Sequence, residues 1–193
     1  MASLAKKLEA SGFHCRRYSY HTTAGDLDVH AAGLREFVRE SSCNIVHFAA
    51  HSLGGLVTLS MLQSFDEIAG GRVVLMGSPL GGSITAQKAG QIPGAKRLLG
   101  EIRPALHQGY GQFPEGRDIG MIAGTKGFGL GMLVGGVGGP GDGTVATRET
   151  RMAGLADHIE IPVTHTGMLY SGEVANQAAY FLRTGGFQHP PAC

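Results

Sequence analysis

A serine stands at a break in the apolar pattern of the stretch VHFAAHSLGGLVTL, residues 46–59. Ser52 follows one apolar run, and a second apolar run begins after two glycines. Ala50 lies two residues before the serine and Gly54 two residues after it. Residues this small let the backbone turn sharply from a strand into a helix, which holds the hydroxyl at a helix N-terminus that favours negative charge. The pentapeptide A-H-S-L-G therefore indicates a nucleophile elbow, with an ordinary serine N-cap as the alternative.

A nucleophilic serine needs a base, and the base needs a group that orients it. Asp142 lies in the turn sequence PGDGTV, after an expected strand at 117–125. His165 lies in PVTHTGML, just after another expected strand at 157–163. Functional residues of open α/β sheets lie at the carboxyl ends of the strands. We therefore predict that Ser52, Asp142 and His165 form a Ser-His-Asp triad at one edge of a sheet.

The sequence resembles the serine lipases and esterases of the α/β-hydrolase superfamily over nearly all of its length. The chain order Ser, Asp, His is also the order of that superfamily. Ala50 in place of the first elbow glycine resembles a variant seen in some lipases. The stretches that carry the resemblance are AHSLGG (50–55), MGSPLGGS (76–83), GDGTV (141–145) and HTGMLYSGEVANQAAYFLRTGGF (165–187).

The resemblance implies a carboxylic-ester hydrolase that acts on small-molecule esters through an acyl-enzyme, with no cofactor and no metal. Ser52 would attack the ester carbonyl, and His165 would take its proton and return one to the leaving alcohol. Asp142 would orient His165, and the backbone N–H of Leu53 would be one oxyanion donor. Thioester and amide substrates stay open, because the triad chemistry is shared. The alternative is a truncated or non-catalytic protein of this fold that acts as a binding module.

The second oxyanion donor of similar hydrolases comes from a loop often marked by His-Gly, and no His-Gly pair occurs in this sequence. The strand before that loop would precede the helix expected at 2–11 and lie between the strands expected at 13–20 and 43–50. Three explanations follow from the resemblance. The chain is truncated or its start is wrongly chosen, or it is a compact hydrolase in which the loop 20–26 supplies the donor, or it is a non-catalytic relic.

Apolar spacing predicts alternating helices and strands. Continuous apolar runs between helical segments favour a mainly parallel sheet with helices on both faces, the α/β class. The resemblance makes this sheet α/β-hydrolase-like but short at its N-terminus. The spacing predicts helices at 2–11, at 27–40 with Asp26 as cap, at 55–65 and at 172–187, and strands at 13–20, 43–50, 72–79, 117–125 and 157–163.

The length of 193 residues predicts one domain, residues 1–193. Residues 81–116 contain three prolines and are either a lid over the serine or a plain packing segment. The glycine-rich tract 127–143 opens no expected helix, so it indicates a mobile loop that delivers Asp142 rather than a dinucleotide site. Residues 188–193 form an expected tail.

Charge and composition exclude several classes of function. The chain has 16 basic and 15 acidic residues and a formal net charge of +1, which makes a nucleic-acid partner a poor candidate. No apolar run approaches the roughly 18–20 residues that span a bilayer, and no signal peptide is visible, so the sequence as written predicts a cytoplasmic protein. A signal peptide could precede Met1 in a longer chain. The three cysteines Cys15, Cys43 and Cys193 match neither a zinc site nor a redox pair and are expected to be reduced, two of them in or near the core.

Overall fold

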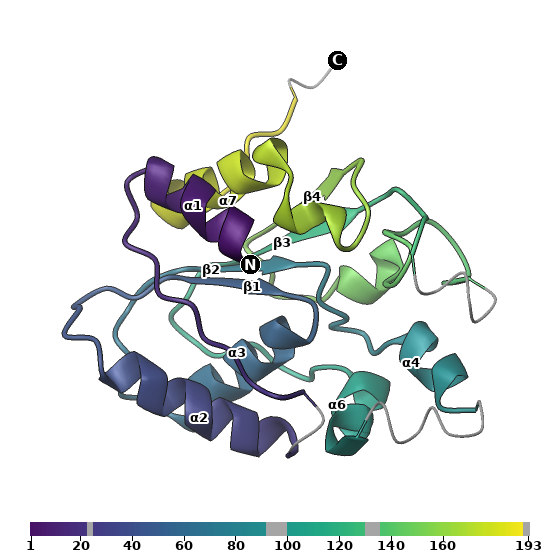
Figure 1. The fold of residues 1–193 in the computed structure, drawn as a ribbon, viewed down its shortest axis with the longest axis horizontal. Helices are drawn as coiled ribbons and strands as arrows, with labels where there is room; N and C mark the ends of the chain where they lie inside the picture. Colours follow the sequence, from purple (N-terminus) through teal and green to yellow (C-terminus); the bar gives the residue numbers. More distant parts are fainter. Residues whose placement is uncertain (23–24, 92–99, 130–135, 191–193) are drawn as a thin grey trace.

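Four parallel strands form the centre of the molecule (Figure 1). The structure is a computed structural model that describes residues 1–22, 25–91, 100–129 and 136–190. The strands lie side by side in the order β1-β2-β3-β4, each parallel to its neighbour. This arrangement confirms the predicted α/β class. The bounds are β1 Phe48–His51, β2 Val73–Met76, β3 Ile119–Gly124 and β4 Asp157–Ile161.

Helices cover both faces of the sheet (Figure 1). Helices α1 (Ala2–Ala10) and α7 (Gly172–Thr184) pack on the face that Val74 and Met76 of β2 present. Helices α2 (Leu27–Arg39) and α3 (Leu53–Ser64) pack on the opposite face, with Val73 and Leu75. All four residues of β2 are fully buried, because both of its faces are covered. Such a strand is a continuous apolar run, as the sequence pattern predicts.

The helix ends follow from the residues next to them. Asp26 accepts a hydrogen bond from the backbone N–H of Val29 and caps α2, as predicted. Gly185 ends α7 with φ 87°, a left-handed conformation that glycine adopts at little cost. No helix among the described residues is both long enough and apolar enough to cross a membrane.

The segment 81–116 contains helices but no strand in its described part. It holds α4 (Ile84–Ala89), the short 3-10 helix η1 (Gly100–Ile102) and α6 (Arg103–Gln108). Residues 92–99 of the candidate lid lie outside the described residues. Two further 3-10 helices, η3 (Thr147–Thr150) and η4 (Gly167–Leu169), lie beside β3 and α7.

The predicted strand at 13–20 is wrong, because this segment makes no ladder with any described strand. Its aromatic residues pack on α2 instead, with the Tyr18 ring 5.3 Å from Phe37 and the Tyr20 ring 4.6 Å from His30. The strand predicted at 43–50 is also shorter than expected, since β1 begins at Phe48.

Two of the cysteines and the start of the tail are described. Cys15 is partly buried and Cys43 is exposed, so only one of these two thiols lies near the core. Both are free thiols.

At the other end of the chain, the backbone N–H of Gln188 donates to the side chain of Gln177, and residues 191–193 lie outside the described part.

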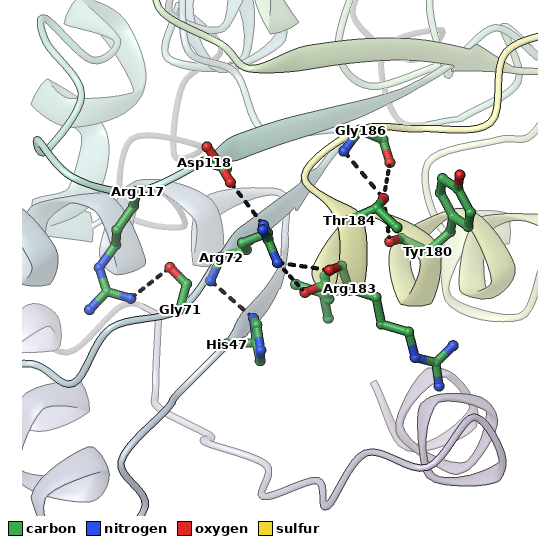
Figure 2. A network of polar contacts seen from close by, with 10 residues as sticks. His47, Gly71, Arg72, Arg117, Asp118, Tyr180, Arg183, Thr184 and Gly186 are labelled. Carbon is green, nitrogen blue, oxygen red and sulfur yellow. Dashed lines mark hydrogen bonds and ion pairs between the residues drawn. The ribbon is translucent and has the colours of Figure 1, made fainter.

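Two arginines hold together the end of the sheet where the strands begin (Figure 2). Arg72 donates to the Asp118 carboxylate at 2.8 Å and to the carbonyls of Leu182 and Arg183 at the end of α7. The Arg117 guanidinium donates to backbone carbonyls of the two loops that enter β1 and β2, and burial lowers its pKa. Its acceptors are Val46, Ile68, Ala69 and Gly71.

Arg117→Met is expected to lower the free energy of unfolding by about 2 kcal/mol, because it leaves partly buried carbonyls without a donor. The matched control is Arg151→Met. Arg151 forms an exposed ion pair with Glu160, so its loss is expected to cost roughly 0–1 kcal/mol. Urea unfolding of both variants measures the difference, and equal losses would contradict an anchoring role for Arg117.

Candidate active site

Ser52 has an unusual backbone. It follows β1 directly, and α3 begins at the next residue. Its φ is 54° and its ψ −126°, which makes it the one non-glycine residue of positive φ in the described part of the chain. A non-glycine residue in such a conformation costs on the order of 1–3 kcal/mol and recurs at functional sites.

The Ser52 hydroxyl is not used as a helix cap. At the starts of α2, α4 and α7, Asp26, Ser83 and Ser171 have extended backbones, and their side chains each accept a capping hydrogen bond. Ser52 differs on both counts. Its geometry therefore fits an elbow that exposes a hydroxyl and does not fit an ordinary N-cap.

Asp142 and His165 form a buried pair. The Nδ1 atom of His165 lies 2.7 Å from Oδ2 of Asp142, and the backbone N–H of His165 donates to the Asp142 carbonyl. The other carboxylate oxygen, Oδ1, accepts from the backbone N–H groups of Thr144 at 2.9 Å and Val145 at 2.8 Å. Asp142 is 1% exposed. These donors stabilise a carboxylate anion that water does not reach.

The hydrogen bond between the pair selects the tautomer of His165. A carboxylate only accepts hydrogen bonds, so Nδ1 of His165 carries the proton and donates it to Asp142. In the neutral ring with this tautomer, Nε2 has a free lone pair. The ring is held at two points, through Nδ1 and through its own backbone N–H, and can act as a base at Nε2.

Two glycines allow this pair to lie against the strand ends. A Cβ on Gly77, just after β2, would lie 2.8 Å from Asp142 Oδ2 and 3.1 Å from His165 Nδ1. A Cβ on Gly124, the last residue of β3, would lie 2.7 Å from the Asp142 Cβ. Any larger residue at either position would displace the aspartate, so the ends of β2 and β3 shape the site.

His51, next to the serine, contacts the pair in a way that sequence reasoning missed. Nε2 of the His51 ring lies 2.9 Å from the His165 carbonyl oxygen. The two imidazole rings are 4.5 Å apart. Because a carbonyl only accepts, His51 Nε2 donates. Burial and the nearby His165 lower the pKa of His51 to about 4.

Ser52 is connected to the Asp142–His165 pair through hydrogen bonds of neighbouring residues. Its N–H donates to the carbonyl of Met76, which precedes Gly77, and His51 links it to His165. Among the described residues, neither the Ser52 hydroxyl nor Nε2 of His165 makes a hydrogen bond. The structure thus brings all three predicted residues to one end of the sheet and pairs two of them. Leu53 is the first residue of α3, where backbone N–H groups have no acceptor within the helix.

A buried glutamate that sequence reasoning did not single out connects the site to the segment 81–116. Glu149 is 5% exposed. One of its carboxylate oxygens accepts from the N–H of Ile84 at the start of α4, and the other from the N–H of Ala146, each at 2.7 Å. Ala146 belongs to the turn that holds Asp142, since it bridges to Gly141. The carboxylate therefore fixes the first residues of α4 to the aspartate turn.

The elbow glycines differ in how tightly they are packed. A Cβ on Gly54 would meet no atom within 4 Å, whereas one on Gly55 would overlap Ser78 Oγ and lie 2.7 Å from its Cβ. The sequence predicts that the elbow needs a small residue at Gly54. The structure places the close approach one residue later, where α3 crosses the end of β2.

Gly55→Ala is expected to lower the free energy of unfolding by about 1–2 kcal/mol, because overpacking against Ser78 outweighs the better helix propensity of alanine. Gly54→Ala, in the same turn of α3, is expected to be neutral or to stabilise by up to about 1 kcal/mol. Thermal unfolding of the two variants tests this, and a larger loss at Gly54 would reverse the assignment.

No group of three metal-binding side chains gathers anywhere in the ranges that the structure describes. His47, which lies before β1 and is partly buried, accepts a hydrogen bond at Nδ1 from the backbone N–H of Arg72 at 3.0 Å. Residues 130–135 of the glycine-rich tract lie outside the described residues.

Solved structures that match this architecture include a lipase, a carboxyl esterase and a phospholipase. The structure matches the mature form of the Bacillus licheniformis lipase BlEst2 with a TM-score of 0.74 and 20% sequence identity, over 95% of this chain and 83% of that one. The chain has an α/β-hydrolase fold. Phospholipase PlaB from Legionella pneumophila matches this α/β-hydrolase fold with a TM-score of 0.67 and 15% identity, over 95% of this chain and 55% of that one.

The sequence comparisons are negative, since no model of a known protein family and no curated protein matches the chain.

The match to the propeptide form of BlEst2 covers 99% of this chain and 48% of that one. Identities of 15–20% establish the α/β-hydrolase fold and leave the activity to the site. The predicted resemblance and fold class are confirmed.

Proposed function

We propose that this protein is a serine hydrolase that cleaves carboxylic esters, of the lipase or esterase type. The observation that carries the proposal is the backbone of Ser52. The chain holds this serine at φ 54° at the start of α3 and leaves its hydroxyl out of the helix cap. The buried Asp142–His165 pair lies at the same end of the sheet. A nucleophile, a base and an orienting carboxylate are the parts that acyl transfer requires.

In the acylation step, Ser52 Oγ attacks the ester carbonyl carbon while His165 Nε2 takes the hydroxyl proton. The carbonyl oxygen becomes an oxyanion and accepts a hydrogen bond from the N–H of Leu53. When the carbonyl re-forms, the C–O bond to the alcohol breaks, and His165 returns the proton to the leaving alcohol. This leaves an acyl group on Ser52. Water, whose proton His165 Nε2 takes, then attacks the acyl carbonyl carbon. As the bond from that carbon to Ser52 breaks, His165 returns the proton to Ser52 Oγ and the acid leaves.

The Ser52 hydroxyl must turn toward His165 Nε2 for this step. Catalytic hydrogen bonds are often long or poorly aligned without substrate and tighten in the substrate complex. Asp142 supports the step in two ways, because it fixes the neutral tautomer of His165 that carries its proton on Nδ1 and it stabilises the imidazolium afterwards. An oxyanion donor such as the Leu53 N–H contributes about 3–4 kcal/mol in related reactions.

The proposed substrate class follows from the site and from the kinds of enzyme among the matched structures. The solved structures of similar fold include a lipase, a carboxyl esterase and a phospholipase. This chain has the same fold and holds Ser52 at a junction between a strand and a helix, which suits it to cleave an ester bond. We therefore propose a small-molecule ester as the substrate, with no cofactor in the reaction.

A fluorophosphonate probe tests the proposal directly, because it reacts covalently only with an activated serine. The expected result is one adduct, located on Ser52 by peptide mass mapping. Ser52→Ala should remove the adduct, and Ser171→Ala, which changes a capping serine of α7, should keep it. Folded wild-type protein that takes no label would refute the esterase proposal and leave the binding-module alternative.

A further inference from the structure

A buried carboxylate ties the aspartate turn, residues 141–146, to the start of α4. Glu149 is 5% exposed, and each of its two carboxylate oxygens accepts a backbone N–H at 2.7 Å, one from Ile84 and one from Ala146. The backbone of Glu149 adds two more bonds, since its carbonyl accepts from Gly81 and its N–H donates to the Ala146 carbonyl. Both partners of the side chain are donors. The position therefore needs an acceptor at each end, which a carboxylate supplies and an amide does not.

The turn held in this way also places Asp142. Its two ends, Gly141 and Ala146, form an antiparallel bridge. Inside the turn, the N–H groups of Thr144 and Val145 donate to Oδ1 of Asp142. A shift of the turn therefore moves these donors, and with them the other carboxylate oxygen, Oδ2, which contacts the histidine base.

The turn has a second link to α4. The Thr85 hydroxyl donates to the Thr144 carbonyl at 2.5 Å, and Thr144 is one of the two residues whose N–H groups donate to Asp142. On its other sides, Asp142 is confined by the ends of β2 and β3. A Cβ on Gly77 would lie 2.8 Å from its Oδ2, and a Cβ on Gly124 would lie 2.7 Å from its Cβ. Asp142 thus lies between two strand ends and a turn whose position depends on α4.

We propose that Glu149 is a positioning residue for the triad. It acts through Asp142, because fixing the turn to α4 keeps the Asp142 carboxylate against Nδ1 of His165. The catalytic part of this inference rests on the proposed function, whereas the placement of Asp142 does not. Without the link, Asp142 moves away from His165, and the base is oriented less often for its reaction with Ser52. A small misplacement of a catalytic group is enough to slow the reaction strongly.

Glu149→Gln tests the link at nearly constant side-chain size. The amide offers one acceptor, so the N–H of either Ile84 or Ala146 loses its partner and faces an NH₂ group instead. We expect at least about tenfold lower kcat for a short p-nitrophenyl ester, with KM within about twofold of the wild type. The reason is that the orientation of the base changes and the binding of the substrate does not.

The proton on Nδ1 of His165 gives a readout that needs no substrate. This proton lies in a 2.7 Å contact between Nδ1 and the Asp142 carboxylate, so its ¹H NMR resonance in ¹⁵N-histidine-labelled protein is expected at low field. In Glu149→Gln we expect the resonance to move upfield and to exchange faster with water. Its loss in Asp142→Asn, where the proton lies on Nε2, assigns it.

Ser83→Ala is the matched control. The Ser83 hydroxyl caps α4 by accepting from the N–H of Ala86 at 3.1 Å, so its loss weakens the same helix and leaves the Glu149 bonds in place. We expect kcat within about twofold of the wild type and an unchanged resonance. Thr85→Val removes the second link at nearly constant size, and should change kcat and the resonance in the same direction as Glu149→Gln, by a smaller factor. This arm holds even where Glu149→Gln does not fold.

Three results would overturn the proposal. The first is an unchanged resonance with wild-type kcat in both Glu149→Gln and Thr85→Val. The second is an equal loss in Ser83→Ala, which would show that only the stability of α4 matters. The third is a raised KM with unchanged kcat in Glu149→Gln, which would mean that Glu149 shapes the substrate site instead. If the wild type takes no fluorophosphonate label, the esterase proposal fails, while the resonance still tests the placement of Asp142, so the two failures are separate results.

Discussion

Asp142→Asn is expected to lower kcat for a short p-nitrophenyl ester by about 10³–10⁴-fold. The asparagine is nearly the same size, and its carbonyl oxygen can still accept from Thr144 and Val145. Its NH₂ group then faces Nδ1 of His165 and donates to it. This fixes the tautomer with the proton on Nε2, so the imidazole no longer has a lone pair directed at Ser52. The variant therefore removes the base while keeping the packing.

The matched control for this variant is Asp118→Asn. The Asp118 carboxylate accepts from the Arg72 guanidinium (Figure 2). It lies just before β3, at the end of the sheet opposite to the site. It should keep kcat within about twofold of the wild type. Thermal unfolding confirms that both variants are folded. An Asp142→Asn enzyme with more than a tenth of wild-type kcat would remove Asp142 from the proposed mechanism.

The elements predicted from the sequence are those whose signals are local. Asp26 caps α2, as predicted, because a cap needs only residues within one turn. The runs that become β2 and β3 are apolar on both faces, so their burial follows from composition alone. The junction at Ser52 was also predictable from the sequence, since a strand, a short turn and a helix follow one another directly along the chain.

The failed predictions depend on contacts between distant residues. The segment 13–20 has strand-like composition, but a strand forms only where a neighbouring strand pairs with it. This segment and β1 instead line the same cavity of about 740 Å³ and do not pair with each other. Its tyrosines pack on α2 instead. In the same way, the close packing at Gly55 comes from Ser78, which lies in a different part of the chain. The sequence around the elbow therefore does not show whether Gly54 or Gly55 is the tightly packed glycine.

The Asp142–His165 pair was predictable for a topological reason. Each residue follows a strand of one parallel sheet, so both must lie at the carboxyl edge. The roles of Glu149 and His51 were not predictable, because each depends on an acceptor or donor more than 60 residues away. A histidine directly before the serine was the only signal for His51, and it did not indicate which way the ring points.

The neutral form of His51 makes folding sensitive to acid. The pKa of His51 is about 4 in the folded state, lowered by burial and by His165, against about 6.5 in an unfolded chain. Above pH 6.5 the ring is neutral in both states and costs nothing. Between pH 6.5 and 4, His51 is protonated in the unfolded chain and neutral in the folded protein. His51 should therefore remove up to about 3 kcal/mol of stability as the pH falls through that range.

His51→Gln isolates this contribution, because glutamine can donate to the His165 carbonyl and does not titrate. Urea unfolding at pH 8 measures the cost of the substitution itself. Between pH 8 and pH 4.5 we expect the wild type to lose about 2–3 kcal/mol more than the variant. Other histidines with lowered pKa, His47 and His158, are present in both proteins and cancel in this difference. Parallel pH profiles for the two proteins would mean that His51 is protonated in the folded state, and a cation stacked against His165 would then disfavour the imidazolium that the proposed mechanism requires.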